Sequence, residues 1–248
     1  MLSATEQVLS RHALDFIDDS YIWKQIKKEK PESAVIDDIL SKSLSKEPLT
    51  VEETASLLAA DDPESIDKIL GAARQLKANV YGNRIVLFGP LYIGNHCVND
   101  CSYCGFRRSN KDAERITLSG EQLKEQVKAL EKKGHKRLIL VYGEHPKYNA
   151  EFIADSVRQV YSVKSEPSGE IRRVNINAAP LNTEDYKIVK DSGIGTYQIF
   201  QETYHHAAYA LCHPENTLKS NYLYRLDGLD RAMEAGIDDV GIGALFGL

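Results

Sequence analysis

Three cysteines stand close together in the chain and could share one metal centre. Cys97, Cys101 and Cys104 have the spacing CxxxCxxC, in the segment that runs from His96 to Gly105. Cysteine thiolates are the standard ligands of iron–sulfur clusters. Three of them on one loop would cover three irons of a 4Fe-4S cube and leave the fourth iron open. An open position can bind a small molecule, as it does in catalytic metal sites, so the spacing favours a catalytic cluster.

Other uses of these cysteines stay open at this point. One is a zinc site of three cysteines and His96, although the adjacent His96 and Cys97 would be awkward partners on one ion. Another is a thioredoxin-like pair at Cys101 and Cys104, which would leave Cys97 unused and lacks the usual helix start. A third is a scaffold that carries a cluster and binds no small molecule. Cys212 is isolated and is expected to be an ordinary buried thiol.

The elements around the cysteines alternate between strands and helices. Strands are expected at residues 84–93, 137–142, 173–178, 195–200 and 239–245. Helices are expected between them, one starting after Ser119 and others at residues 150–162, 183–191 and 226–235. This alternation implies a parallel sheet. Crossovers of one hand would curve the sheet into a (β/α) barrel of the TIM type, whose active site lies at the carboxyl ends of the strands. The cysteines follow such an end.

The expected fold class is therefore α/β, a partial (β/α) TIM-type barrel over residues 81–248. Five units are visible, and the chain stops at Leu248, soon after a strand that has no covering helix. We expect the sequence to be a fragment in which the C-terminal part of the barrel is missing. Residues 1–80 carry helix signals instead, such as the capping-box spacing of Thr50 and Glu53. They are expected to form a helical N-terminal extension.

Composition narrows the classes of function. The 248 residues are 42% hydrophobic and 27% charged, with a net charge of -5, as in an ordinary globular protein. The acidic balance argues against a nucleic-acid-binding protein. No apolar run reaches the roughly 20 residues of a membrane helix, and the N-terminus lacks the apolar stretch of a signal peptide. We therefore expect a cytoplasmic protein without nucleic-acid or membrane partners, where clustered cysteines more often bind metal than form disulfides.

The cysteine segment is also similar to the signature of a known family. With Tyr103 before the third cysteine and Gly105 after it, the segment resembles the CxxxCxφC motif of the radical S-adenosylmethionine (SAM) superfamily. The resemblance implies that Cys97, Cys101 and Cys104 hold a 4Fe-4S cluster whose open iron is chelated by SAM. In that family the reduced cluster cleaves SAM to methionine and a 5'-deoxyadenosyl radical. Electrons would come from a donor such as ferredoxin or flavodoxin, and Tyr103 would flank the SAM adenine.

Two glycine-containing segments follow the same resemblance. Gly143 and Glu144, at the end of the second expected strand, resemble the short family motif that meets the SAM amino group. Gly241 and Gly243, in the fifth expected strand, resemble the segment that packs against adenine. Each pair taken alone is also typical of a tight loop or of close packing. Their placement at successive strand ends is what makes cofactor binding the expectation.

Two strands are expected to add polar side chains to the site. The resemblance places Gln201, Glu202 and His205 at the end of the fourth strand, facing SAM ribose or substrate, with Gln201 binding cofactor and the other two catalytic. On the third strand, alternation puts Arg173 and Asn175 on one face. A polar face on a barrel strand usually points at a ligand, so both are expected to bind cofactor. A structural network of these side chains is the alternative.

Longer runs narrow the resemblance to the radical SAM aromatic amino-acid lyases. They comprise residues 92–106, 200–205 and 231–243. Within that family they are most similar to the tyrosine lyases of FeFe-hydrogenase maturation, and next to those of thiamine thiazole synthesis. The resemblance implies that a small molecule, tyrosine or a related amino acid, is cleaved between Cα and Cβ to p-cresol and dehydroglycine. In hydrogenase maturation, dehydroglycine goes on to carbon monoxide and cyanide.

Two features depart from the hydrogenase-maturing pattern. His145 stands where the family motif Gly-Glu-Asp-Pro has aspartate. The family's second cysteine motif, which holds an auxiliary cluster for assembling carbon monoxide and cyanide, has no counterpart in the 248 residues. The step that the resemblance supports for this chain is therefore the first one, the SAM-dependent cleavage of an amino acid.

Overall fold

The chain divides into two compact units. The computed structural model describes residues 7–167 and 169–248. One unit consists of residues 17–86, and the other joins residues 7–16 to residues 87–248. The boundaries of the helical extension expected at residues 1–80 thus differ in the structure. Its boundary with the barrel falls after residue 86, residues 7–16 belong with the barrel, and residues 1–6 lie outside the described part of the chain.

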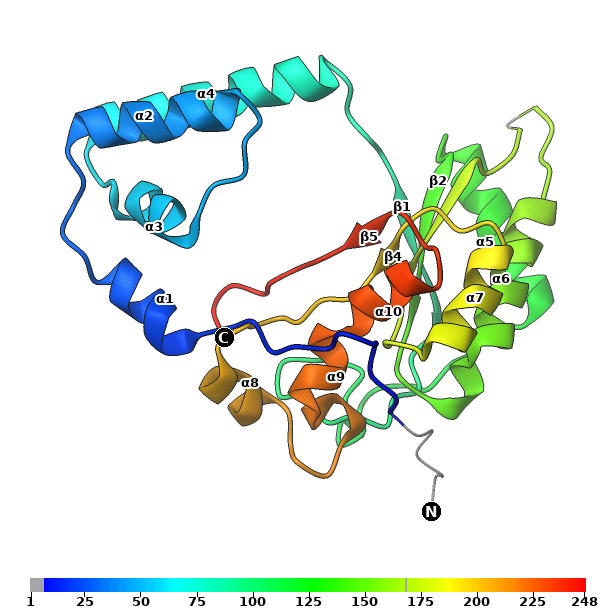
Figure 1. The fold of residues 1–248 in the computed structure, drawn as a ribbon. Helices are drawn as coiled ribbons and strands as arrows, with labels where there is room; N and C mark the ends of the chain where they lie inside the picture. The colour runs from blue at the N-terminus through cyan, green and yellow to red at the C-terminus, as the bar shows by residue number, and fades with distance from the viewer. Residues whose placement is uncertain (1–6, 168) are drawn as a thin grey trace. The chain divides into compact units, whose positions relative to one another are not determined.

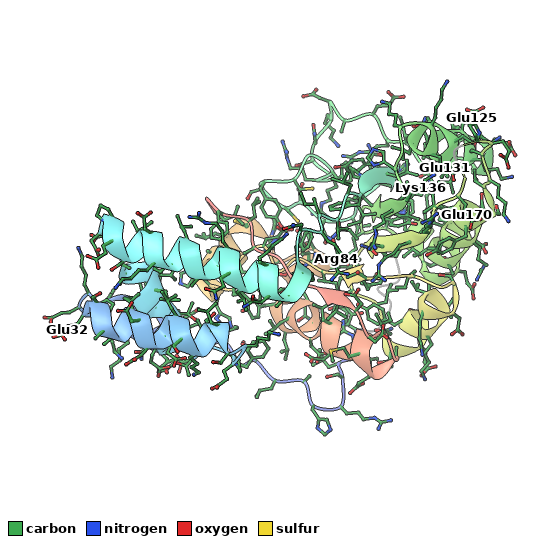
Figure 2. All side chains as sticks on the ribbon, turned by 90° about the horizontal axis from the view of Figure 1, so that it is seen from above. Glu32, Arg84, Glu125, Glu131, Lys136 and Glu170 are labelled. Carbon is green, nitrogen blue, oxygen red and sulfur yellow. The ribbon has the colours of Figure 1, made fainter. Side chains whose placement is uncertain are left out.

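Residues 17–86 form the helices α1 (Asp19–Ile26), α2 (Ser33–Leu44), α3 (Val51–Ala59) and α4 (Pro63–Tyr81) (Figure 1). The capping box predicted at α3 is confirmed. Glu53 N donates to Thr50 Oγ1 at 3.2 Å, and Thr50 N donates to Glu53 Oε2 at 2.7 Å. Asp62 starts α4 in a similar way, since its side chain accepts from Ser65 N. Figure 2 shows the long α4 ending beside Arg84, whose backbone N–H donates to Tyr81 O at 3.3 Å.

The other unit is built on a parallel sheet. Its strands are β1 (Gly89–Gly94), β2 (Arg137–Tyr142), β3 (Arg173–Asn177), β4 (Tyr197–Gln198) and β5 (Val240–Gly241), which pair in chain order and in parallel. The connections contain α5 (Gly120–Lys132), η1 (Pro146–Tyr148), α6 (Ala150–Ser162), α7 (Thr183–Asp191), α8 (His206–Cys212), η2 (Leu218–Ser220), α9 (Tyr222–Leu226) and α10 (Gly228–Glu234). Within the described residues, no helix combines the length and apolar character needed to cross a membrane.

One face of the sheet packs against helices and the other carries polar groups. The apolar core joins Leu138, Leu140, Val174 and Ile176 of the strands to Val127, Val157 and Val189 of α5, α6 and α7. In Figure 1 these three helices lie together along the outer side of β1, β2 and β3. The opposite face of β3 carries the half-buried Arg173, Asn175 and Asn177. Helices on one face and polar groups on the other are the arrangement of a barrel wall, so the predicted partial (β/α) barrel is confirmed.

The first strand is shorter than the sequence predicted. Pairing of β1 starts where Gly89 faces Leu138, because the partner strand β2 itself begins only at Arg137. The preceding apolar side chains therefore stay outside the sheet, and Ile85 is 80% exposed. A run of strand-forming residues becomes a strand only where a partner backbone lies beside it.

The last strands are also short, and one expected helix begins later than predicted. β4 and β5 pair over two residues each, although single backbone hydrogen bonds continue beyond them, such as Ile199 N to Gly241 O at 3.0 Å. The helix expected at residues 226–235 corresponds to α10, which begins at Gly228, and it is preceded by the short helix α9, which was not predicted. The expected spans 137–142, 150–162 and 183–191 coincide with β2, α6 and α7.

Asp227 and Arg231 form a buried ion pair that joins distant parts of the chain. Arg231 is fully buried, and its Nη1 lies 2.6 Å from Asp227 Oδ2. The guanidinium also donates to Leu181 O and Tyr224 O, each at 2.9 Å. Asp227 in turn accepts from the backbone N–H of Ser10 at 2.9 Å and from the Ser10 hydroxyl. The pair therefore fastens residues 7–16 and the segment after β3 to the start of α10.

We expect Arg231→Met to lower the free energy of unfolding by about 3–5 kcal/mol. The change leaves the Asp227 carboxylate buried without its cation, which is the costly way to break a buried pair. Lys128→Met, on the exposed side of α5, is the control and should stay within about 0.5 kcal/mol of wild type. Urea denaturation measures both. Equal stability of the two variants would show that the pair contributes nothing.

Candidate active site

The cysteine loop follows the carboxyl end of β1 and rests on backbone contacts with the end of β2. Gly143 N donates to Gly94 O at 2.9 Å, and Val98 N donates to Glu144 O at 2.8 Å. A Cβ atom placed on Gly143 would lie 2.2 Å from His96 O. Only glycine allows the two backbones to approach this closely. Gly143 thus positions the loop by having no side chain.

Arg115 supports the loop from the other side. Its Nη1 donates to Asn95 O at 2.8 Å and Phe106 O at 2.9 Å, and its Nη2 donates to Arg107 O at 2.7 Å and Asn110 O at 3.1 Å. A loop without regular structure leaves many carbonyl groups without backbone partners. One guanidinium with a fork of donors satisfies four of them here. Sequence reasoning missed this residue, which looks like an ordinary surface arginine.

The loop opens onto a cavity of about 190 Å³ that gathers seven of the residues predicted for the site. They are Cys97, Cys101, Cys104, Tyr103, Gly143, Glu144 and Glu202. The cavity is also lined by Asn99, Lys219 and Arg225, which sequence reasoning missed. Its described lining does not include Cys212, the fourth cysteine. Three thiols, two carboxyl groups and two cations therefore share one small space at the carboxyl edge of the sheet.

The donor set of this cavity fits three cluster-bound thiolates. Burial raises the pKa of the Cys97 thiol, and backbone N–H groups of Asn99 and Glu144 partly offset the rise. Burial likewise raises the pKa of Cys101, and the positive charge of Lys219 opposes it. Phe106 N donates to Cys104 Sγ at 3.4 Å. N–H groups aimed at sulfur and a nearby cation stabilise thiolates, which are the form that binds iron.

The arrangement differs from a site for a single metal ion. Among residues 7–167 and 169–248, no three His, Cys, Asp or Glu side chains are grouped so as to hold one ion. His96, the candidate fourth zinc ligand, has its ring 5.5 Å from the ring of His145. A 4Fe-4S cube places each thiolate on a different iron, so its cysteines need not converge on one point.

A hydrogen-bonded chain fixes Glu144 in the cavity. Asn99 is 2% exposed, and its Nδ2 donates to Glu144 Oε2 at 2.6 Å. The Asn99 Oδ1 atom accepts from Lys219 N at 2.9 Å. The buried amide thus uses both of its ends, one for the carboxylate and one for the segment that carries Lys219. Asn99 lies between Cys97 and Cys101 in the motif, which is the signal that could have marked it.

Tyr103 is held by hydrogen bonds in one orientation. Its hydroxyl lies 2.7 Å from His213 Nε2 and 2.8 Å from Lys219 Nζ. His213 Nδ1 is 2.7 Å from Tyr209 O, which can only accept, so Nδ1 carries the ring proton. Nε2 then accepts from Tyr103 O–H, and the hydroxyl oxygen accepts from Lys219. Burial supports the neutral imidazole by lowering the pKa of His213 to about 4.

Glu202 faces the cavity, whereas its predicted neighbours do not line it. Glu202 adopts a left-handed backbone with φ of 71°, a strained conformation for a residue with a side chain and one often found at functional sites. Its Oε1 lies 3.6 Å from Lys219 Nζ. Gln201 is buried and donates to Tyr222 O at 3.4 Å, and His205 precedes α8. Glu202 is therefore the predicted residue of this group that lines the same cavity as the three thiols.

Arg173 and Asn175 lie away from the cavity, in a polar network at the opposite edge of the sheet. Arg173 is the first residue of β3, forms an ion pair with Asp239 and donates to Thr196 Oγ1 at 3.2 Å. Asn175 Oδ1 accepts from Thr196 N at 3.1 Å. Both side chains are used by the barrel itself, which is the structural alternative to the predicted cofactor contact.

Gly241 and Gly243 stand where neighbouring side chains come close. A Cβ atom on Gly241 would lie 2.7 Å from Gln198 Cγ, and one on Gly243 would lie 2.4 Å from Phe200 Cδ1. Phe200 lines the cavity. Gly243 thus lets the Phe200 ring pack against the segment that follows β5, while Gly241 serves close strand packing.

The comparisons with known proteins agree with a cluster site of this kind. The model of the radical SAM superfamily matches residues 91–248, and the chain belongs to this superfamily. Members of the family bind a 4Fe-4S cluster and SAM. They act on small-molecule substrates and take electrons from reductants.

Two kinds of protein are among those that the chain resembles most. A crystal structure of HydG, a maturase of the FeFe-hydrogenase, has a TM-score of 0.90 and 44% identity, covering 94% of this chain and 51% of its own. HydG from Carboxydothermus hydrogenoformans has a TM-score of 0.80 and 39% identity, covering 91% and 52%. The 2-iminoacetate synthase of Salmonella typhimurium is 33% identical over 84% of this chain and 53% of its own length. The chain spans about half the length of these relatives.

We expect Gly143→Ala to remove most of the iron that the protein takes up on anaerobic reconstitution. The new methyl group would collide with the His96 carbonyl, and a backbone shift that relieves such overpacking costs about 1–3 kcal/mol. Gly105→Ala is the matched control in the same loop, because no heavy atom lies within 4 Å of its Cβ position. Iron and sulfide per chain are measured for both. Equal loading would refute the close contact.

His213 predicts a stability change in mild acid. Its pKa is about 4 when folded and 6.5 when free, so between these values the unfolded chain binds a proton that the native state does not. The free energy of unfolding therefore falls as pH drops from 6.5 toward 4, by about 3 kcal/mol at most. Urea midpoints of metal-free protein at pH 7 and pH 5 measure it. His213→Gln should lose less stability over this interval than wild type, and an equal loss would exclude His213 as the cause.

Proposed function

We propose that this protein is a radical SAM lyase that splits tyrosine between Cα and Cβ. The products would be p-cresol and dehydroglycine, on the route to carbon monoxide and cyanide for FeFe-hydrogenase maturation. The observation that carries the proposal is the likeness of nearly the whole chain to two HydG structures at about 40% identity. The electron donor is proposed to be a small redox protein such as ferredoxin or flavodoxin.

The cavity residues have chemistry suited to this role. Cys97, Cys101 and Cys104 would each bind one iron of the cluster. When bound and reduced, the cluster supplies the electron that cleaves SAM and starts the radical chemistry. The Glu144 carboxylate, held by Asn99, is proposed to accept hydrogen bonds from the SAM amino group, because a carboxylate suits an ammonium group.

The remaining lining groups would orient the organic ligands and exclude water. Glu202 is proposed to accept hydrogen bonds from ribose hydroxyls or from the substrate amino group. The guanidinium of Arg225, steadied by donation from its Nε to Phe200 O at 3.0 Å, suits a carboxylate. The rings of Tyr103, Phe106 and Phe200 give the cavity an apolar wall, and a water-poor wall protects a reactive radical.

A second candidate function shares the cleavage of tyrosine and differs in the later products. The Salmonella typhimurium relative is named a 2-iminoacetate synthase, and 2-iminoacetate is another name for dehydroglycine. A tyrosine lyase serving thiamine thiazole synthesis would release this compound without going on to carbon monoxide and cyanide. The two candidates are therefore separated by the later products and not by p-cresol.

The test uses the full-length gene product, reconstituted anaerobically with iron and sulfide. SAM, dithionite and tyrosine are added, and 5'-deoxyadenosine and p-cresol are quantified by chromatography. Both compounds are expected. Carbon monoxide and cyanide, trapped separately, would then favour the hydrogenase-maturing function over the thiazole function.

Cys97→Ala is the control for the cluster, and it should abolish both 5'-deoxyadenosine and p-cresol. If wild-type protein forms 5'-deoxyadenosine without p-cresol, tyrosine is the wrong substrate and the SAM chemistry survives. If the iron-loaded protein forms neither, the lyase proposal fails and a cluster-carrying scaffold replaces it.

A further inference from the structure

Lys219 is a buried cation in the wall of the cysteine cavity. Its side chain is 8% exposed, and it lines the same cavity as the three thiols. Removing an ammonium group from water is costly unless other groups compensate its charge. The Tyr103 hydroxyl accepts from Nζ at 2.8 Å, and Glu202 Oε1 lies 3.6 Å away. One neutral hydroxyl and one carboxylate at this distance are modest compensation for a charge at this depth.

Hydrogen bonds fix the backbone of Lys219 at both its N–H and its carbonyl group. These contacts hold its side chain at the cavity. Its N–H donates to Asn99 Oδ1 at 2.9 Å, and its carbonyl accepts from Tyr209 O–H at 2.5 Å. The ammonium lies 5.4 Å from the centre of the Tyr103 ring, within the range of a cation–π contact. Two residues of the cysteine loop, Asn99 and Tyr103, therefore hold this one lysine.

The charges around the cavity indicate an electrostatic role for Lys219. With a cluster bound, three thiolates would add their negative charge to that of the Glu144 and Glu202 carboxylates, opposite the cations of Lys219 and Arg225. Each electron that a cluster accepts adds one more negative charge to this space. In a buried site, where screening by water is weak, a fixed cation favours the reduced state over the oxidised state. Net charge near the cluster is one of the factors that set the reduction potential of iron–sulfur proteins.

We propose that Lys219 is a counter-charge that raises the reduction potential of the cluster held by Cys97, Cys101 and Cys104. Its hydrogen bond to Tyr103 keeps the ammonium at the cavity wall. Lys219 thus acts on the electron-transfer step through its positive charge and is not a ligand of iron. The inference rests on the three cysteines being the cluster ligands, as proposed above, and is independent of the substrate.

The test compares reduction potentials in reconstituted full-length protein. Midpoints are obtained by anaerobic redox titration with mediators, followed by the electron paramagnetic resonance signal of the reduced cluster, and iron per chain is measured alongside. Lys219→Met should load iron and have a more negative midpoint than wild type. Lys219→Arg keeps the charge and should recover most of the shift. Lys128→Met, a lysine removed from the exposed side of α5, should match wild type.

Tyr103→Phe separates the charge from the hydrogen bond. The ammonium remains in this variant, so the midpoint should move less than in Lys219→Met. Iron-loaded Lys219→Met with a wild-type midpoint would overturn the proposal, and so would a shift shared equally by Lys128→Met.

A variant that fails to load iron is also informative. Lys219→Gln is a second neutral variant that can still donate to Tyr103, and its midpoint should shift like that of Lys219→Met. If neither neutral variant loads iron while Lys219→Arg does, the charge is needed for cluster assembly and not for setting the potential, and the proposal is overturned. If Lys219→Arg also fails to load, the charge is insufficient and the proposal falls. None of these readouts uses tyrosine, so failure of the lyase activity would leave them unchanged.

Discussion

The close contact between Gly143 and the His96 carbonyl is the constraint on which the rest of the site depends. The three cysteines lie on a loop that has no regular structure of its own. Its position is set by backbone contacts with the end of β2 and by the four carbonyl groups that Arg115 collects. β2 is an interior strand, because it pairs with β1 on one side and with β3 on the other. The sheet thus determines the position of the cysteine loop.

A buried polar network then joins this loop to a segment far away in the chain. It runs from Glu144 through Asn99 to Lys219, and from Lys219 through Tyr103 to His213. Hydrogen bonds in such surroundings are stronger than in water, and leaving one unpaired costs more. The region of α8, η2 and α9 carries no recognisable motif. It nevertheless supplies the two cations, Lys219 and Arg225, that line the same cavity as the three thiols.

The sequence predicted what local patterns determine and missed what long-range packing decides. The start of α6 is set locally, because the Asn149 side chain caps it by accepting from Phe152 N, and the apolar periodicity of α6 and α7 is local as well. Ile85 and its neighbours look like a strand, but a strand also needs a partner. Alternation correctly placed Arg173 and Asn175 on the polar face of β3. Alternation does not tell how far along the strand the cavity lies, so the cofactor contacts expected of these two residues stay a prediction. Lys219 gave no signal, because burial of a lysine depends on groups that are distant in the chain.

The link between Ser10 and Asp227 bears on how the protein is made. These residues are separated by 217 positions, so the early segment leaves the ribosome long before its partner exists. Contacts between residues so far apart in the chain form late in folding. Residues 7–16 therefore gain this contact only after Asp227, at the start of α10, has been synthesised.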